Sequence, residues 1–121
     1  MSLRLYDTRT RTVRPLEPLH PGHVGLYVCG PTVQAVPHVG HLRSGVAIDV
    51  LHRWLLASGL EVTFVRNVTD VDDKIINDAA KNGEPWWALS TRITRAFREA
   101  YEALQVLQED GRISNLKLAE A

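Results

Sequence analysis

Two histidines, His38 and His41, lie three residues apart with Gly40 between them, a short distance after an apolar run that ends at Cys29. Imidazole N–H groups donate hydrogen bonds to phosphate oxygens, and this spacing at a helix start places both rings near one face. Gly40 has no side chain, so a flat base could lie against the backbone there. The pattern is typical of a site that stabilises charge on a phosphate. Two partly exposed loop histidines are the alternative interpretation.

The segments around the histidines must position them, and their patterns indicate a strand, a loop, a helix and a second strand. Residues 24–28 are apolar and β-branched or aromatic, which predicts a short strand buried on both faces. Residues 61–68 predict another. Between them, apolar residues recur every four positions and predict an amphipathic helix from about residue 42 to Ser58-Gly59: Leu42, Val46, Val50 and Trp54, with Leu51 and Leu55 beside them. This order favours a parallel βαβ unit, and ligands collect where its strands end and its helix begins.

The rest of the chain predicts flanking elements of an α/β domain. Residues 3–18 alternate loosely and suggest two short strands. Asp70 and Asp72 offer caps for a short helix over residues 73–81, which Asn82-Gly83 would close. Pro85 fits the first turn of a long final helix. We expect that helix to pack on the sheet through an apolar stripe: Trp86, Ile93, Phe97, Ala100, Tyr101, Leu104 and Leu107.

Composition limits the function classes. The 121 residues suffice for one domain, and fourteen basic residues balance fourteen acidic ones. A net charge of zero predicts no broad electrostatic capture of nucleic acid or membrane, so any RNA contact would need a local patch or protein missing here. A single cysteine forms no internal disulfide, and no apolar stretch approaches the length of a membrane span. These features predict a cytoplasmic protein without a membrane partner.

Two long segments carry a family resemblance. The stretch LYVCGPTVQAVPHVGHLRSGVAIDVLHRWL, followed by EVTFVRNVTDVDDKIINDAA, resembles the N-terminal catalytic region of cysteinyl-tRNA synthetase, a class I aminoacyl-tRNA synthetase. The specificity lies in YVCGPTV, the histidine motif and NVTDVDDKII in this order. The resemblance implies that residues 1–107 form the N-terminal half of a Rossmann-like nucleotide-binding fold, and that residues 108–121 are a divergent polar tail. It implies ATP-dependent activation of cysteine and its ligation to tRNA(Cys).

The resemblance also implies roles for individual residues. The catalytic His38 and His41 would bind the ATP phosphates and the adenylate transition state. The nucleotide would further contact Gly40, Pro31 and Thr32, and the substrate cysteine would contact Gly30 and Thr69. Cys29 would be the first ligand of a zinc ion that binds the substrate thiol.

Metal chemistry agrees in part with these implied roles. Zinc that takes up a thiolate separates cysteine from serine, because a hydroxyl is a poor ligand at neutral pH. A small buried cysteine at a strand end is the structural alternative for Cys29. ATP normally carries Mg²⁺, and Asp70, Asp72 and Asp73 are candidate ligands, although helix capping is the preferred interpretation for most of them.

The family resemblance leaves alternatives open because parts of the synthetase pattern are not present in this sequence. A lysine-rich KMSKS-type loop and the family's other zinc ligands have no counterparts here. One alternative is a truncated, non-catalytic synthetase paralogue that binds a nucleotide or a protein partner. Another is a cysteine ligase of mycothiol synthesis, which would use an amino sugar as acceptor instead of tRNA.

Overall fold

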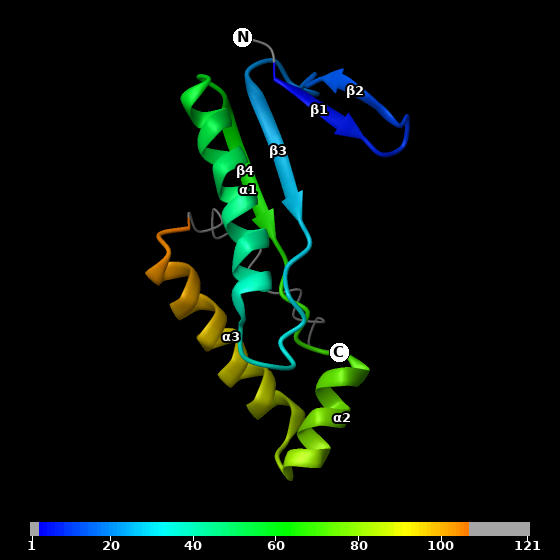
Figure 1. Cartoon of the computed structure of the whole chain (residues 1–121), viewed down its shortest axis with the longest axis vertical. Coiled ribbons are helices and arrows are strands. Elements are labelled where there is room, and N and C mark those ends of the chain that lie inside the picture. The colour runs from blue at the N-terminus through cyan, green and yellow to red at the C-terminus, as the bar shows by residue number, and fades with distance from the viewer. Residues whose placement is uncertain (1–2, 107–121) are drawn as a thin grey trace.

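The computed structural model describes residues 3–106, which contain four strands and three helices (Figure 1). In chain order the elements are β1 (Arg4–Asp7), β2 (Thr12–Pro15), β3 (His23–Val28), α1 (Val39–Ala57), β4 (Glu61–Arg66), α2 (Asp73–Asn82) and α3 (Trp86–Ala103). Residues 107–121, which include Leu107 and the predicted polar tail, lie outside the described part. No described helix is long and apolar enough to cross a membrane.

The predicted βαβ unit is confirmed. β3 and β4 pair in parallel, from His23 opposite Glu61 to Val28 opposite Arg66, and α1 connects them. The two short N-terminal strands are also confirmed: β1 and β2 form a separate antiparallel hairpin that projects beyond the start of β3 (Figure 1). The chain is therefore an α/β fold in which α1 lies along one face of the parallel pair.

Burial of β3 on both faces was predicted, and this is wrong for the described residues. Val24 is buried, but Gly25 is exposed and Tyr27 retains 58% of its accessible surface. In a strand, successive side chains point to opposite faces, and α1 covers only one of them. Val24 and Tyr27 therefore lie in different surroundings although both belong to one apolar run.

The predicted apolar stripe of α1 also differs from the face that is buried. Val46, Val50 and Trp54 are exposed, whereas the buried positions are Gly45, Asp49, His52 and Leu55, of which the pattern predicted only Leu55. Asp49 accepts a hydrogen bond from Nε of Arg53 at 2.8 Å, and the ring of His52 packs on Phe64 of β4 with centroids 5.1 Å apart. Asp49 and His52 thus occupy the sheet-facing side, which hydropathy alone assigned to aliphatic residues. The helix also begins earlier than predicted, at Val39.

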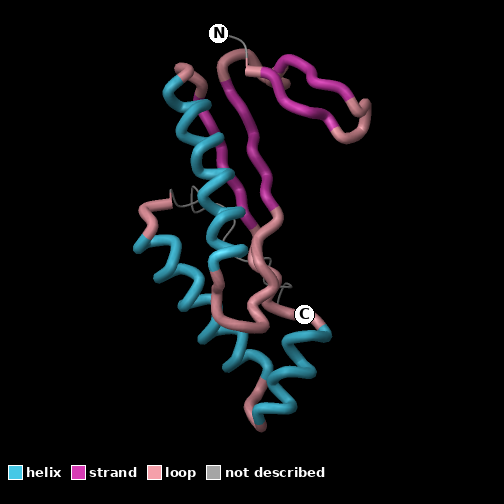
Figure 2. Tube along the Cα trace, viewed as in Figure 1, coloured by secondary structure: helices cyan, strands magenta, loops and turns pink. Residues whose placement is uncertain are grey.

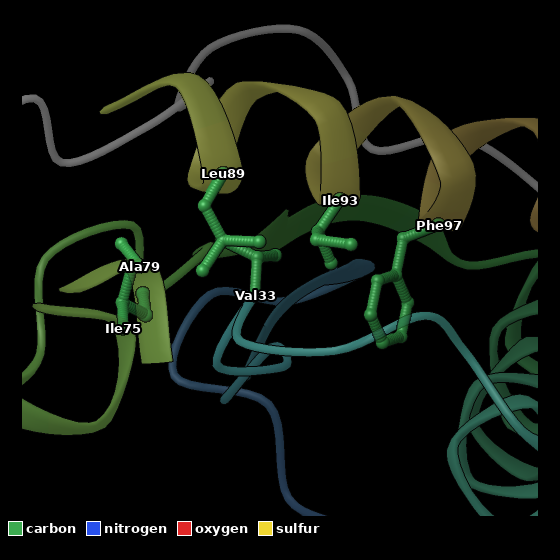
Figure 3. Packing of buried hydrophobic residues seen from close by; sticks show 6 residues of the cluster. All are labelled: Val33, Ile75, Ala79, Leu89, Ile93 and Phe97. Atoms are coloured by element: carbon green, nitrogen blue, oxygen red, sulfur yellow. The ribbon is translucent and has the colours of Figure 1, made fainter. Parts of the chain in front are cut away.

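The main hydrophobic core lies beyond the ends of β3 and β4 instead of on the sheet. Figure 3 shows α3 directing Leu89, Ile93 and Phe97 onto the side chains of Ile75 and Ala79 of α2 and onto Val33. The expectation that α3 packs mainly on the sheet is therefore wrong.

The helix ends that frame this core agree with the sequence prediction. Asp72 caps α2 by accepting from the backbone N–H of Lys74 at 2.8 Å. Gly83 ends α2 in the left-handed region, at φ 68°. Pro85 precedes α3 and is its N-cap residue. The loops that follow β3 and β4 run together between the parallel pair and this core (Figure 2).

Candidate functional site

A cavity of about 180 Å³ opens where β3 and β4 end and α1 begins. This edge is where parallel α/β sheets collect ligands, because side chains and backbone N–H groups converge there. The lining combines predicted site residues with others that the sequence did not single out: Val28, Cys29, Gly30, Pro31, His41, Ser44, Gly45, Arg66 and Tyr101.

The loop after β3 is hydrogen-bonded to the loop after β4. The backbone N–H of Thr69 donates to the carbonyl of Pro31 at 3.1 Å, and that of Val33 donates to the carbonyl of Thr69 at 3.2 Å. Thr32 and Thr69 thus pair as a parallel bridge. Gly30 and Pro31 line the cavity, whereas Thr32 and Thr69 are not among its lining residues.

The two histidines are stacked at the first turn of α1. Their ring centroids are 3.8 Å apart, so the expectation that they share one face is confirmed. His38 is the N-cap residue, and its Nδ1 accepts from the backbone N–H of Gly40 at 3.0 Å. The backbone N–H of His38 in turn donates to Nδ1 of His41 at 3.3 Å. Because both Nδ1 atoms accept, the neutral rings carry their proton on Nε2, which remains available as a donor.

The charge state of His41 follows from its surroundings. Burial is the larger cause that lowers the pKa of His41, and charge repulsion from the neighbouring His38 adds to it. Two stacked rings resist double protonation because like charges repel. At neutral pH His41 is therefore a neutral N–H donor at the cavity wall.

Gly40 supports this arrangement through its lack of a side chain. A Cβ at Gly40 would lie 2.9 Å from Cε1 of His38, so only glycine leaves the capping ring in place. The sequence predicts that Gly40 contacts a base, and the structure shows that its missing side chain makes room for the His38 imidazole.

A metal site is not formed by the described residues. Cys29 is exposed and lines the cavity together with His41. Within residues 3–106, no group of three or more His, Cys, Asp or Glu side chains could hold a metal ion. Structural zinc normally takes four protein ligands and catalytic zinc three, so Cys29 does not complete either. For Asp72, the helix-capping role is the one observed.

Arg66 and Tyr101 belong to the cavity wall but were not predicted as site residues. Arg66 is 6% exposed, and its guanidinium carbon lies 5.1 Å from the centroid of the Phe64 ring and 4.9 Å from that of Tyr101. Its Nη2 is buried without a hydrogen-bond partner. The signal in the sequence was an arginine at the last position of an apolar strand, where a buried charge is unusual.

Comparison with known proteins gives a consistent result. The family model described as the catalytic domain of class I (C) tRNA synthetases matches residues 15–117. A cysteine–tRNA ligase of Frankia casuarinae is 64% identical over 107 residues, which are 88% of this chain and 20% of that protein. The corresponding ligase of Beutenbergia cavernae is 62% identical over 104 residues, 86% of this chain and 22% of the relative. The chain thus spans about a fifth of these relatives.

A solved structure extends the comparison to three dimensions. Mycobacterium tuberculosis methionyl-tRNA synthetase, in complex with methionyl-adenylate, superposes with a TM-score of 0.66 at 29% sequence identity. The alignment covers 74% of this chain and 18% of that one. The parallel βαβ arrangement described above is therefore also that of a synthetase that holds an aminoacyl adenylate.

Proposed function

The chain belongs to the family of class I (C) tRNA synthetase catalytic domains, and we propose that it carries the ATP-binding half of a cysteine–tRNA ligase. In this reaction a carboxylate oxygen of cysteine attacks the α-phosphorus of ATP, and pyrophosphate leaves. The cysteinyl group of the adenylate then passes to a hydroxyl at the 3′ end of tRNA(Cys), and AMP leaves. The proposal implies a cytoplasmic site of action and no membrane partner.

The observation that carries this proposal is the orientation of the stacked histidines. Backbone N–H groups occupy Nδ1 of both rings, so each neutral ring keeps one N–H donor at Nε2. We assign these donors to the phosphate oxygens of ATP and to the charge that builds on the α-phosphate during attack. Preorganised donors of this kind stabilise a transition state because they need no rearrangement when charge develops. The N-terminus of α1 adds a favourable dipole.

Residues at the ends of β3 and β4 are assigned to the substrates. Pro31, Thr32 and Gly40 would contact the nucleotide, and Gly30 and Thr69 would shape the cysteine pocket. Cys29 lines the same cavity and would supply one zinc ligand, with the remaining ligands from outside residues 3–106. Such an ion would discriminate the thiol of cysteine from a hydroxyl, and Mg²⁺ would accompany ATP.

Isothermal titration with ATP and with a non-hydrolysable cysteinyl-adenylate analogue tests the proposal. We expect His41→Asn to weaken binding of the analogue by about 10- to 100-fold, since a hydrogen bond to a charged group contributes about 1.5–3 kcal/mol. His20→Asn is the matched control, because His20 is an exposed histidine near the opposite end of β3. Equal affinities of the wild type and the His41 variant, or equal losses in both variants, would contradict the proposal.

Exchange and acceptor assays separate the alternatives. ATP–pyrophosphate exchange that depends on cysteine is expected once the chain is joined to the remainder of a relative's catalytic domain. Nucleotide binding without exchange in that joined protein would favour a non-catalytic binding module. Transfer to an amino sugar in preference to tRNA would favour the mycothiol branch, whereas the names of both curated relatives favour tRNA.

A further inference from the structure

Positive charge is concentrated on the β1–β2 hairpin. Residues 4–15 contain four arginines and one aspartate, a net charge of +3, although the whole chain has a formal net charge of zero. The arginines are Arg4, Arg9, Arg11 and Arg14, and all four are exposed. Glu17 is the next acidic residue along the chain. The hairpin is therefore a local basic surface on an otherwise mildly acidic protein.

The one aspartate of the hairpin is already engaged. Asp7 accepts from the backbone N–H of Arg9 at 2.9 Å, from the hydroxyl of Thr10 at 2.9 Å and from Nη1 of Arg14 at 3.3 Å. The hydrogen bond from Thr10 is the largest cause that lowers the pKa of the Asp7 carboxyl. Asp7 therefore shapes the turn and pairs with Arg14, and it leaves the guanidinium groups of Arg9 and Arg11 unneutralised.

Two surface arginines of α3 differ from the turn arginines in that each lies close to a carboxylate. On α3, Arg92 pairs with Glu84 at 2.7 Å, and Nε of Arg95 lies 3.7 Å from Glu99. Between residues 3 and 106, neither Arg9 nor Arg11 has an ion-pair partner. The two turn arginines are thus available to an external anion, whereas Arg92 and Arg95 face a competing carboxylate.

The hairpin also presents an aromatic ring. Tyr6 of β1 is 62% exposed and lies on the same two-stranded ribbon as the arginines. Guanidinium groups match phosphate oxygens in bidentate geometry, and exposed aromatic rings stack on unpaired bases. From this combination we propose that the β1–β2 hairpin is an RNA-binding element that contacts the phosphate backbone of the tRNA. The inference rests on the proposed function for the identity of the RNA.

The position of the hairpin makes this contact independent of the nucleotide cavity. The hairpin precedes the first residue of β3, whereas Val28 at the last residue of β3 lines the cavity (Figure 1). Six residues of extended strand separate the two ends by about 20 Å. RNA held by the hairpin therefore leaves the cavity open to ATP.

Fluorescence anisotropy of the 121-residue chain with a labelled tRNA(Cys) transcript tests the inference. The test variant combines Arg9→Gln with Arg11→Asn, because Arg11 has a φ of 55° and asparagine tolerates that region. We expect roughly tenfold weaker binding and a slope of log affinity against log salt that is shallower by about two, one for each lost phosphate contact. Arg92→Gln combined with Arg95→Gln removes the same charge and should change binding less than twofold.

Three results would overturn the inference. Equal losses of tRNA affinity in the two double variants would show that only overall charge matters. No loss of affinity in the hairpin variant would show that the hairpin does not bind the RNA. Binding to vesicles of 30% phosphatidylserine with the same dependence on Arg9 and Arg11, and no binding to tRNA, would assign the surface to a membrane. Adenylate-analogue titration of the hairpin variant separates this test from the proposed function, because its affinity should equal that of the wild type.

Discussion

The backbone N–H of Gly30 donates to Oδ1 of Asn67 at 2.7 Å and so joins the end of β3 to the end of β4. The two backbones approach so closely that a Cβ at Gly30 would lie 1.7 Å from the carbonyl oxygen of Asn67. A side chain at position 30 would therefore push apart the loops that follow β3 and β4, the first of which lines the cavity.

Gly30→Ala is expected to lower the free energy of unfolding by about 1–3 kcal/mol, because backbone atoms must move to admit the methyl group. Urea denaturation followed by circular dichroism measures this change. Gly25→Ala is the matched control, since a Cβ at Gly25 meets nothing within 4 Å. A Gly30 variant as stable as the Gly25 variant would show that the loops part easily.

Gly45 and Tyr101 form a second close approach, between α1 and α3. A Cβ at Gly45 would lie 2.5 Å from Cε1 of the Tyr101 ring. We expect Gly45→Ala to destabilise the wild type by about 1–2 kcal/mol and to be nearly neutral in a Tyr101→Leu background, where the ring is gone. Chemical denaturation of the four proteins gives the coupling energy. Additive effects would mean that the ring moves aside at little cost.

Stability is expected to depend on the protonation of His41. Burial lowers the pKa of this group in the folded chain, so the unfolded chain binds the proton more tightly. The stabilising contribution is complete above the ordinary histidine pKa of about 6.5 and is lost as pH falls through the lowered pKa of the folded chain. The free energy of unfolding should therefore decrease between pH 7 and pH 5, and less so for His41→Gln. Parallel pH profiles of the two proteins would contradict this assignment.

Asp72 is expected to act as a helix cap. Asp72→Ala removes the acceptor for the backbone N–H of Lys74 and should cost about 1 kcal/mol of stability. Asp70→Ala is the control, because Asp72 and not Asp70 is the N-cap residue of α2. The measurement is the midpoint of urea unfolding. Equal shifts would show that charge near the start of α2, and not the capping bond, provides the stabilisation.

The spacing of apolar residues and the positions of turn- and cap-forming residues were sufficient to predict much of the fold. Apolar runs at the positions of β3 and β4 and an intervening helical pattern predicted the parallel unit correctly. The cap at Asp72 and the left-handed Gly83 marked both ends of α2. These signals are local, since each depends on a few adjacent residues.

Contacts between distant residues account for what the sequence did not predict. Arg66 and Tyr101 are far apart in sequence, and only the packed structure brings the guanidinium onto the ring. The buried face of α1 carries Asp49 and His52, which a hydropathy pattern assigns to solvent. The histidine pair was predictable because its spacing is local, but its stacking and the occupation of Nδ1 depend on backbone geometry.

The exposed face of α1, which carries Val46, Val50 and Trp54, should tolerate substitution unusually well, although the helix's aliphatic residues are densest there. Val50 retains 61% of its surface, so a lysine there keeps its ammonium in water, and the thermal midpoint should stay within a few degrees of the wild type. Leu55 is 2% exposed, and a lysine there would bury a charge and unfold the chain. A redesign of α1 for better solubility should therefore place charged residues at Val46 and Val50 and leave the buried face, with Asp49 and His52, unchanged.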